Sequence, residues 1–266
     1  MSAILPRPLT VHCKSLVGVR AASTYGIDLQ ERNVVHLWFS TLAELVPRAT
    51  ALEALLDNEE IARADRFRFA PDRDRFVLGH GLLRSLIGRY LNVDGAALRI
   101  QRGPFGKPFL NDTELRFNLS DTKDALVLAV AWDHELGVDI ETITRRADHE
   151  AVAHHYFTPD EVERIQVAGA GAGASDLAAK RYFLDLWTRK EAVLKASGVG
   201  IMEDLHALRV LDGHNELIIQ QEDFLKYAAE VYHVQSLACG PEHLISVATE
   251  RPMEVRLLSA ALESPS

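Results

Sequence analysis

Three carboxylates in this sequence are placed where they could act on one ion. Asp139 and Glu141 lie two residues apart in the segment 137–141, GVDIE, which predicts a strand that carries both carboxylates on one face. Glu191 lies in the segment 183–198, FLDLWTRKEAVLKASG, which predicts a helix. Carboxylates held near one another repel unless a cation or protons neutralise them, and the hard ion Mg2+ prefers such oxygen ligands. The pattern therefore predicts an acidic metal site.

The predicted helix also supplies a cation beside this site. Glu191 and Lys195 are four residues apart, so they are neighbours on one helix face. An acidic metal site with a lysine beside it is suited to handling phosphate. Each part alone has a simpler interpretation, since a Glu–Lys pair of this spacing is usually a weak surface salt bridge and alternating acids are usually a solvated strand face. Their presence in one chain favours the site.

The order G-V-D-I-E followed by W-x-x-K-E-A-x-x-K resembles the 4'-phosphopantetheinyl transferases of the Sfp type, which move the phosphopantetheine arm of coenzyme A onto a serine of a carrier protein. Four further segments resemble elements of that family in the family's order. They are a basic helix, a G-K-P element, an F-N-[IL]-S element and an F-[ST]-x-x-E element, at residues 63–87, 106–110, 117–120 and 155–165. An ordered set of motifs is far more specific than any one of them.

The resemblance implies an enzyme that transfers 4'-phosphopantetheine from coenzyme A to a serine of an apo acyl or peptidyl carrier protein and releases 3',5'-adenosine diphosphate. It implies that Asp139, Glu141 and Glu191 hold Mg2+, for which Mn2+ can substitute. Lys195 is expected to neutralise or protonate the leaving phosphate, and Glu161 to accept the serine proton. The expected catalytic residues are Glu161, Glu191 and Lys195. The residues expected to contact coenzyme A are Arg63, Arg75, Lys107, Ser120, Asp121, Lys190 and Lys195.

One position departs from the family's pattern. The F-N-[IL]-S-H element ends in a histidine that approaches the coenzyme phosphates, and Asp121 stands at that place in this sequence. An anion in place of a cation should weaken phosphate binding unless a metal or a neighbouring lysine compensates. The departure bears on coenzyme recognition and not on the type of reaction.

The amino-acid composition limits the classes of protein to which this chain could belong. The chain has 266 residues, of which 47% are hydrophobic and 25% charged, as in ordinary globular proteins. Its longest apolar run, Ala125–Trp132, is too short to span a membrane, and the N-terminus lacks the pattern of a secretion signal. A formal net charge of −9 disfavours nucleic acid as a partner. The two cysteines, Cys13 and Cys239, are expected to be reduced thiols in the cytoplasm.

Periodicity predicts two halves with the same order of elements. Residues 1–32 are expected to form an irregular extension, whereas residues 33–136 and 137–266 are each expected to fold as strand, helices and β-meander. The expected fold is α+β, with two similar, pseudo-duplicated halves, each an antiparallel sheet with helices, and the active site in the cleft between them. This duplication favours a monomer. The expected helices are 49–67, 71–92, 149–155, 159–167 and 175–196, and the expected strands are 33–39, 98–101, 116–119, 126–132, 137–141, 208–211, 216–220, 231–238 and 244–248.

The alanine and glycine run at residues 168–175 is expected to be a flexible surface loop and not a phosphate-binding loop, because it follows no strand and lacks the G-x-G-x-x-G spacing. Two other classes of function stay open. One is a different metal-dependent phosphoryl-transfer or phosphodiester enzyme. The other is a non-catalytic module that binds coenzyme A or a carrier protein, which the departure at Asp121 makes worth testing.

Overall fold

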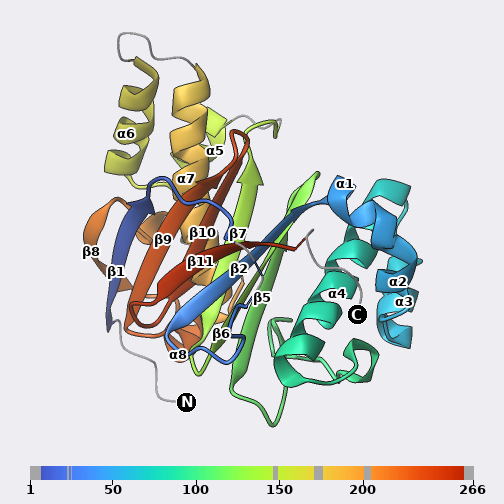
Figure 1. The fold of residues 1–266 in the computed structure, drawn as a ribbon. Coiled ribbons are helices and arrows are strands. Elements are labelled where there is room, and N and C mark those ends of the chain that lie inside the picture. The colour runs from blue at the N-terminus through green and yellow to red at the C-terminus, as the bar shows by residue number, and fades with distance from the viewer. Residues whose placement is uncertain are drawn as a thin grey trace.

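The computed structural model describes residues 7–22, 24, 26–145, 149–170, 176–200 and 205–260. Two large β-sheets pack face to face, and a long helix covers the outer side of each (Figure 1). The fold is therefore α+β, as the sequence predicts. None of the helices among these residues is long and apolar enough to cross a membrane.

The first sheet has five strands in the order β7-β10-β9-β1-β8. Neighbouring strands are antiparallel except β1 and β9, which run parallel. One face of this sheet packs on helix α7 and the other packs on the second sheet, because side chains alternate along a strand. The strands are β1 (Arg7–Leu16), β7 (Leu136–Thr142), β8 (Gly213–Ile219), β9 (Val231–Cys239) and β10 (His243–Thr249).

The second sheet has four strands in the order β11-β2-β6-β5, and these are antiparallel except for the parallel pair β11 and β2. Its outer face packs on helix α4. The strands are β2 (Val34–Thr41), β5 (Leu115–Asp121), β6 (Ala125–Trp132) and β11 (Glu254–Ser259). A separate short ribbon pairs β3 (Gln101–Arg102) with β4 (Pro108–Phe109).

The two long helices are α4 (Ala70–Leu91) and α7 (Asp176–Ser197). Shorter helices surround them at the two ends of the molecule (Figure 1). The shorter α-helices are α1 (Leu42–Leu45), α2 (Ala49–Glu53), α3 (Asn58–Ala64), α5 (His149–Tyr156), α6 (Pro159–Ala170) and α8 (Glu222–Tyr227), and the 3-10 helices are η1 (Val46–Arg48), η2 (Gly95–Ala97) and η3 (Leu205–Ala207).

The N-terminal segment is a correction to the prediction. Residues 1–32 were expected to be irregular, but Arg7–Leu16 form β1, which lies inside the first sheet between β8 and β9. Leu9, Val11 and Cys13 alternate into the core against α7, while polar residues occupy the positions between them. The period-two pattern is therefore present, but it is short and interrupted by polar residues.

The C-terminal strand joins the opposite sheet. β11 pairs with β2 at the edge of the second sheet, so each terminal strand completes the sheet that is built mainly from the other predicted half. The division of the chain at residues 136 and 137 stays a prediction.

Three element predictions are wrong. The helix expected at 49–67 is interrupted, because Asp57 caps α3 through its side chain and separates α3 from α2. No strand forms at 208–211, where Leu208 and Leu211 are buried against the first core without a strand partner. The strand expected at 98–101 is reduced to β3. Of the predicted 168–175 loop, residues 168–170 end α6 and residues 171–175 lie outside the described residues.

Candidate active site

The two sheets meet where β5 and β7 lie side by side, and side chains of β5 hold them together. Asn118 Oδ1 accepts a hydrogen bond from Val138 N at 2.8 Å. Ser120 Oγ accepts one from Ile140 N at 3.4 Å. The F-N-L-S segment therefore connects the second sheet to the first, and it places Ser120 beside the carboxylate strand.

Gly137 allows β7 to approach α7 closely. A Cβ atom at this position would clash with backbone atoms of Ala192 and Ala196 on α7. Backbone atoms of a packed helix cannot move aside as a flexible side chain can, so only glycine fits. The close approach brings the next residues on this face, Asp139 and Glu141, beneath the side chains of α7.

Asp139 and Lys195 form the centre of the site. Lys195 Nζ lies 2.6 Å from Asp139 Oδ1 and 2.8 Å from Ser120 Oγ. Ser120 Oγ in turn donates to Asp139 Oδ1 at 2.9 Å. Asp139 is only 6% exposed, and its second carboxylate oxygen, Oδ2, is buried with no hydrogen-bond partner among the described residues. A buried carboxylate oxygen of this kind is an open position for a cation or a donor.

The two other carboxylates are electrostatically coupled to Asp139. Burial, and then the negative charge of Asp139, raises the pKa of Glu141 to about 7, although Glu141 also forms an ion pair with Arg145. Burial and the charge of Asp139 likewise raise the pKa of the Glu191 carboxyl, against the opposing charges of Lys195 and Arg145. The charge of Asp139 therefore makes both glutamates harder to ionise.

The fit of this group to a metal ion can be tested on these residues. No three His, Cys, Asp or Glu side chains in the described ranges already converge on one point as a metal-binding group. The donor chemistry nevertheless fits a hard divalent cation: Asp139 Oδ2 is unpartnered, and the mutual repulsion of the carboxylates is relieved by positive charge. The carboxylates are close enough to interact, but two of them form ion pairs within the protein. Arg145 pairs with Glu141, and Lys195 pairs with Asp139.

A polar hollow of about 710 Å³ adjoins Glu141. Arg75, Lys123 and Arg145 line it with positive charge, and Asp121 lines it with negative charge. Arg75 Nε lies 2.7 Å from Asp121 Oδ2, so the two charges offset each other. Burial raises the pKa of Asp121, while the charges of Arg75 and Lys195 lower it, which places this carboxylate within the field of the site.

Arg63 lies elsewhere, in a second hollow of about 320 Å³ that it shares with Arg66 and Arg102. Its guanidinium group stacks over the Phe76 ring, with the carbon 5.1 Å from the ring centroid. Burial, and then the charges of Arg102 and Arg66, lowers the pKa of Arg63. Asp57, Glu59 and Glu60 also line this hollow, so its charge is mixed and not purely positive.

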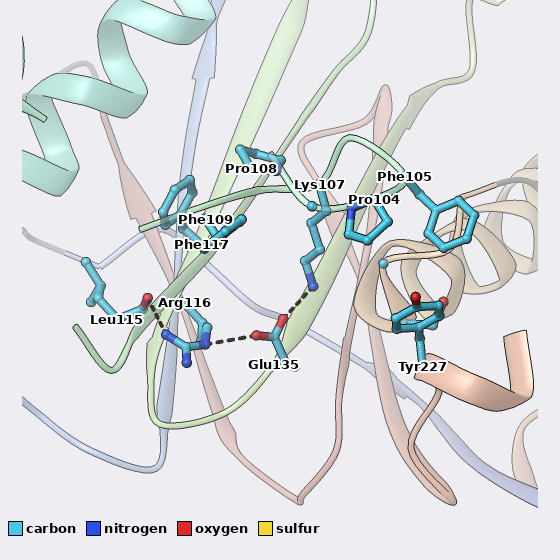
Figure 2. A pocket seen from close by; sticks show the side chains of 13 residues that line it. Pro104, Phe105, Lys107, Pro108, Phe109, Leu115, Arg116, Phe117, Glu135 and Tyr227 are labelled. Atoms are coloured by element: carbon cyan, nitrogen blue, oxygen red, sulfur yellow. Dashed lines mark hydrogen bonds and ion pairs between the residues drawn. The ribbon is translucent and has the colours of Figure 1, made fainter. Parts of the chain in front are cut away.

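Lys107 has all its donors engaged within the protein. Its Nζ lies 2.7 Å from Glu135 Oε2 and 3.0 Å from the carbonyl oxygens of Leu136 and Ala196. Figure 2 shows Lys107 and Arg116 converging on Glu135 beside an apolar pocket of about 180 Å³. Lys107 thus ties the G-P-F-G-K-P loop to the start of β7 and the end of α7.

The positions of Glu161 and Lys190 do not fit the roles expected for them. Both are 0% exposed and pair with each other, Lys190 Nζ lying 2.9 Å from Glu161 Oε2. The Glu161 carboxylate also accepts hydrogen bonds from Thr158 N at 2.9 Å and Val210 N at 2.8 Å, and Lys190 donates to carbonyl oxygens within residues 205–208. Glu161 therefore caps α6 and Lys190 holds the chain after α7, and neither faces the carboxylate group. We correct both roles to structural ones.

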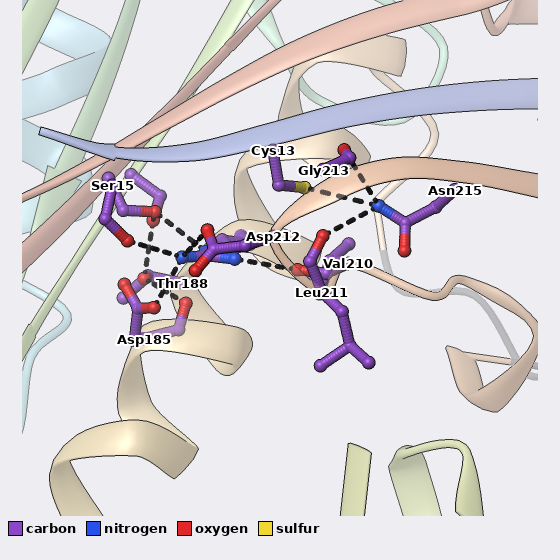
Figure 3. Close-up of polar contacts among 12 residues, drawn as sticks. Cys13, Ser15, Asp185, Thr188, Val210, Leu211, Asp212, Gly213 and Asn215 are labelled. Carbon is purple, nitrogen blue, oxygen red and sulfur yellow. Dashed lines mark hydrogen bonds and ion pairs between the residues drawn. The ribbon is translucent and has the colours of Figure 1, made fainter. Parts of the chain in front are cut away.

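A neighbouring network anchors α7 to the first sheet. The buried Arg189 side chain donates to Ser236 Oγ at 2.9 Å, to Ser15 Oγ at 3.0 Å and to Val210 O at 2.9 Å, and pairs with Asp185. These partners lie on β9, β1, the segment before β8 and α7. Figure 3 labels three of these partners, Ser15, Asp185 and Val210. Arg189 and Lys190 thus fix one side of α7, so that Glu191 and Lys195 are presented to β7.

The structure adds side chains that the sequence reasoning missed. Lys123 and Arg145 line the hollow beside Glu141, and Arg66 and Arg102 join Arg63. A signal was present for two of them, because Lys123 follows Asp121 by two residues and Arg145 follows Glu141 by four. Of the predicted residues, the structure brings together a set near β7: Arg75, Ser120, Asp121, Asp139, Glu141, Glu191 and Lys195.

An α+β fold with buried carboxylates, a lysine and a cation-lined hollow defines a protein suited to a phosphate-bearing ligand. Comparison with known proteins identifies the family. A model of the 4'-phosphopantetheinyl transferase superfamily matches residues 135–248, and a model of the N-terminal region of 4'-phosphopantetheinyl transferases matches residues 42–133.

Curated relatives agree. The chain is 36% identical over 171 residues to the 4'-phosphopantetheinyl transferase HetI of Nostoc sp., with 63% of this chain and 70% of the relative covered. It is 32% identical over 231 residues to a phosphopantetheinyl transferase of Thraustochytrium sp., covering 81% and 78%. It is 30% identical over 205 residues to the 4'-phosphopantetheinyl transferase psf-1 of Bacillus pumilus, covering 76% and 82%. The chain belongs to the 4'-phosphopantetheinyl transferase superfamily and is a transferase.

Proposed function

We propose that this protein transfers the 4'-phosphopantetheine group of coenzyme A to a serine of an apo acyl or peptidyl carrier protein, in an Mg2+-dependent reaction that releases 3',5'-adenosine diphosphate. The observation that carries the proposal is the buried, unpartnered Oδ2 of Asp139 beside Lys195 and Ser120. Family membership supports coenzyme A as the donor and carrier protein as the acceptor.

We propose that Asp139, Glu141 and Glu191 hold the Mg2+ ion, for which Mn2+ can substitute. A bound divalent cation would supply positive charge for the diphosphate of coenzyme A and for the transition state. The coupling of the three carboxylates supports this role, since a cation removes the repulsion that raises the pKa of Glu141 and of Glu191.

Lys195 is proposed to stabilise the leaving phosphate. Its ammonium is held by Asp139 and by Ser120, so it is oriented before the substrate arrives and needs little reorganisation during the reaction. Ser120 is placed to donate to a phosphate oxygen when its hydroxyl turns away from Asp139.

The proton acceptor is revised from Glu161 to Glu191. Glu161 is fully buried in its pair with Lys190, whereas the Glu191 carboxylate has no hydrogen bond or ion pair with any other described residue. Burial raises the pKa of Glu191 independently of the repulsion from Asp139, and this part of the shift would make it a better base than an ordinary glutamate. The serine oxygen forms a bond to phosphorus, the bond to adenosine diphosphate breaks, and Glu191 takes the serine proton.

We propose that the basic side chains around the site bind the phosphates of coenzyme A. Arg75, Lys123 and Arg145 line the hollow beside Glu141, and Arg63 acts with Arg66 and Arg102 in the second hollow. Lys107 is proposed to act by holding the G-P-F-G-K-P loop in place. A monomeric state and a cytoplasmic location remain proposals from the sequence.

The test is to incubate the purified protein with coenzyme A, Mg2+ and an apo carrier protein, and to weigh the carrier by mass spectrometry. A gain of the phosphopantetheine mass, lost when the metal is chelated, is the expected result. Coenzyme hydrolysis without modification of the carrier would indicate a different phosphoryl-transfer enzyme. Binding without either reaction would indicate a non-catalytic module.

A further inference from the structure

Three histidines form a row across adjacent strands of the first sheet. His12 on β1 is the register partner of His214 on β8 and of His233 on β9. Residues paired in register point to the same face of a sheet, so the three imidazoles lie side by side. The face they share is opposite to α7, since Val11 and Cys13 on the other face of β1 pack into the core with that helix.

The rings are in direct contact. The centroids of His12 and His214 are 4.8 Å apart, and those of His12 and His233 are 5.0 Å apart with the planes 14° from parallel. All three residues are exposed or half-buried. A hollow of about 110 Å³ adjoins His12 and His233, which leaves room for solvent ligands beside the rings.

The separation of two ring nitrogens is the decisive observation. Nδ1 of His214 lies 3.4 Å from Nδ1 of His12. Two nitrogen ligands bound at about 2.0–2.1 Å to one tetrahedral ion are about 3.3–3.4 Å apart. The two atoms therefore already have the spacing of a chelating pair, whereas the same distance is long for a hydrogen bond.

A carboxylate fixes the chemical state of one ligand. Glu216 Oε1 lies 3.0 Å from His214 Nε2, so this nitrogen carries the proton that it donates to the carboxylate. In the neutral imidazole, Nδ1 of His214 then holds the lone pair and faces His12. Carboxylates that accept from the second nitrogen of a histidine are typical of metal-binding histidines.

We propose that His12 and His214, with His233 as a further ligand after a side-chain rotation, form a surface site for a divalent transition-metal ion of the Zn2+, Ni2+ or Cu2+ class. Imidazole nitrogen suits these ions, whereas Mg2+ prefers oxygen. The described residues hold no preassembled set of three ligands, so the site is a two-nitrogen chelate that solvent and His233 complete.

The test uses Zn2+ as the probe, titrated calorimetrically into the full chain in the presence of excess Mg2+. The wild-type protein should bind one Zn2+, and His12→Ala and His214→Ala should each weaken binding at least 10-fold. His154→Ala is the matched control, because His154 is an exposed histidine on α5 outside the row. It should bind Zn2+ as the wild type does. Asp139→Ala should also bind normally, because the carboxylate site is separate.

A second measurement guards against misfolding of a variant. Zn2+ should raise the melting temperature of the wild-type protein and of His154→Ala, and raise it much less for His214→Ala, whose side chain is exposed on the edge strand β8. The proposal is overturned if the wild type binds no Zn2+, if both row variants bind as tightly as the wild type, or if Asp139→Ala abolishes binding.

Discussion

Lys195 Nζ lies 2.6 Å from Asp139 Oδ1, and the pair joins α7 to β7 at the one face of the strand that carries no apolar side chain. Asp139 is nearly buried while the Lys195 side chain is 28% exposed. The buried surroundings of Asp139 therefore fix the position of its carboxylate, and this carboxylate in turn positions the Lys195 ammonium. The geometry of the site accordingly depends on Asp139.

Asp139→Asn should nearly abolish transfer while leaving the fold intact. The amide keeps the shape and the hydrogen bonds to Lys195 and Ser120 in altered form, but it removes the charge that a cation would bind. Loss of a group that stabilises charge in the transition state costs about 100-fold or more. Carrier modification measures the rate, and circular dichroism measures the fold. A rate close to wild type in a folded variant would rule out the proposed acidic site.

Lys195→Met should reduce turnover far more than stability. The variant keeps the hydrocarbon stem, and Asp139 keeps its hydrogen bond from Ser120, so the melting temperature should fall by only a few degrees. Lys195→Arg is the matched control, because it retains the charge and should restore stability. Normal turnover together with a large loss of stability in Lys195→Met would return this residue to a purely structural role.

Asp121→His should tighten coenzyme A binding. The substitution removes the ion pair of Arg75 with Asp121, leaves its ion pair with Asp72, and replaces an anion by a group that becomes cationic below about pH 6.5. We expect about fivefold tighter binding, which corresponds to about 1 kcal/mol, and a larger effect as the pH falls. Calorimetric titration of coenzyme A, with and without Mg2+, measures it. Weaker binding that appears only with Mg2+ would instead assign Asp121 a role in supporting the metal.

Glu161→Gln should destabilise the protein and leave the turnover of folded molecules within a few-fold of wild type. The substitution leaves the buried Lys190 ammonium without its carboxylate partner. Removal of one partner of a buried ion pair lowers the free energy of unfolding by about 3–5 kcal/mol. Glu163→Gln, at an exposed position of the same helix, should change neither quantity. Pairing Glu161→Gln with Lys190→Met should recover much of the stability. Loss of turnover without loss of stability would restore Glu161 as the base.

His36 should make the fold sensitive to acid. Burial lowers the pKa of His36 to about 4, and its Nδ1 lies 2.7 Å from the Tyr90 hydroxyl oxygen. The unfolded chain, in which histidine has a pKa near about 6.5, binds more protons between these values, so the free energy of unfolding falls as the pH drops through that window, by up to about 1.4 kcal/mol per pH unit.

His36→Phe should reduce the dependence of the free energy of unfolding on pH by up to about 1.4 kcal/mol per pH unit, which corresponds to one bound proton. Urea unfolding at pH 7, 6 and 5 measures it, and His154→Ala serves as the exposed control. His80, whose pKa burial also lowers to about 4, keeps part of the slope in the variant. Equal slopes in wild type and His36→Phe would show that His36 is already protonated in the folded state.

Local patterns predicted the parts of this structure that local forces determine. α4, α7, β6 and β7 were predictable because each has a clear period or a continuous apolar run. The pairing of Glu161 with Lys190 was not, because it joins α6 to α7 through the core, and a sequence does not show that two charges are buried together.

The candidate site likewise has features that local sequence patterns predict and features that they do not. The shared face of Asp139 and Glu141 follows from strand alternation, and the spacing of Glu191 and Lys195 follows from the helix. The resemblance to a family brought the two segments together, and no local rule would have done so. Arg145 and Lys123 were missed although each closely follows a predicted site residue, because such spacing alone is common among surface residues and only the fold places the two side chains beside Glu141.

The exchange of terminal strands has a consequence for biosynthesis. β1 leaves the ribosome before the other described strands, but its partners β8 and β9 are made only after residue 212. β2 likewise emerges early and waits for β11, the last described strand. Neither sheet can be completed until β9 and β11 have been translated, and pairings this distant in sequence form slowly. The nascent chain must therefore carry two unfinished sheets while the residues between these strands are made, and a stop codon before β11 would leave β2 without its neighbour at the edge of the second sheet.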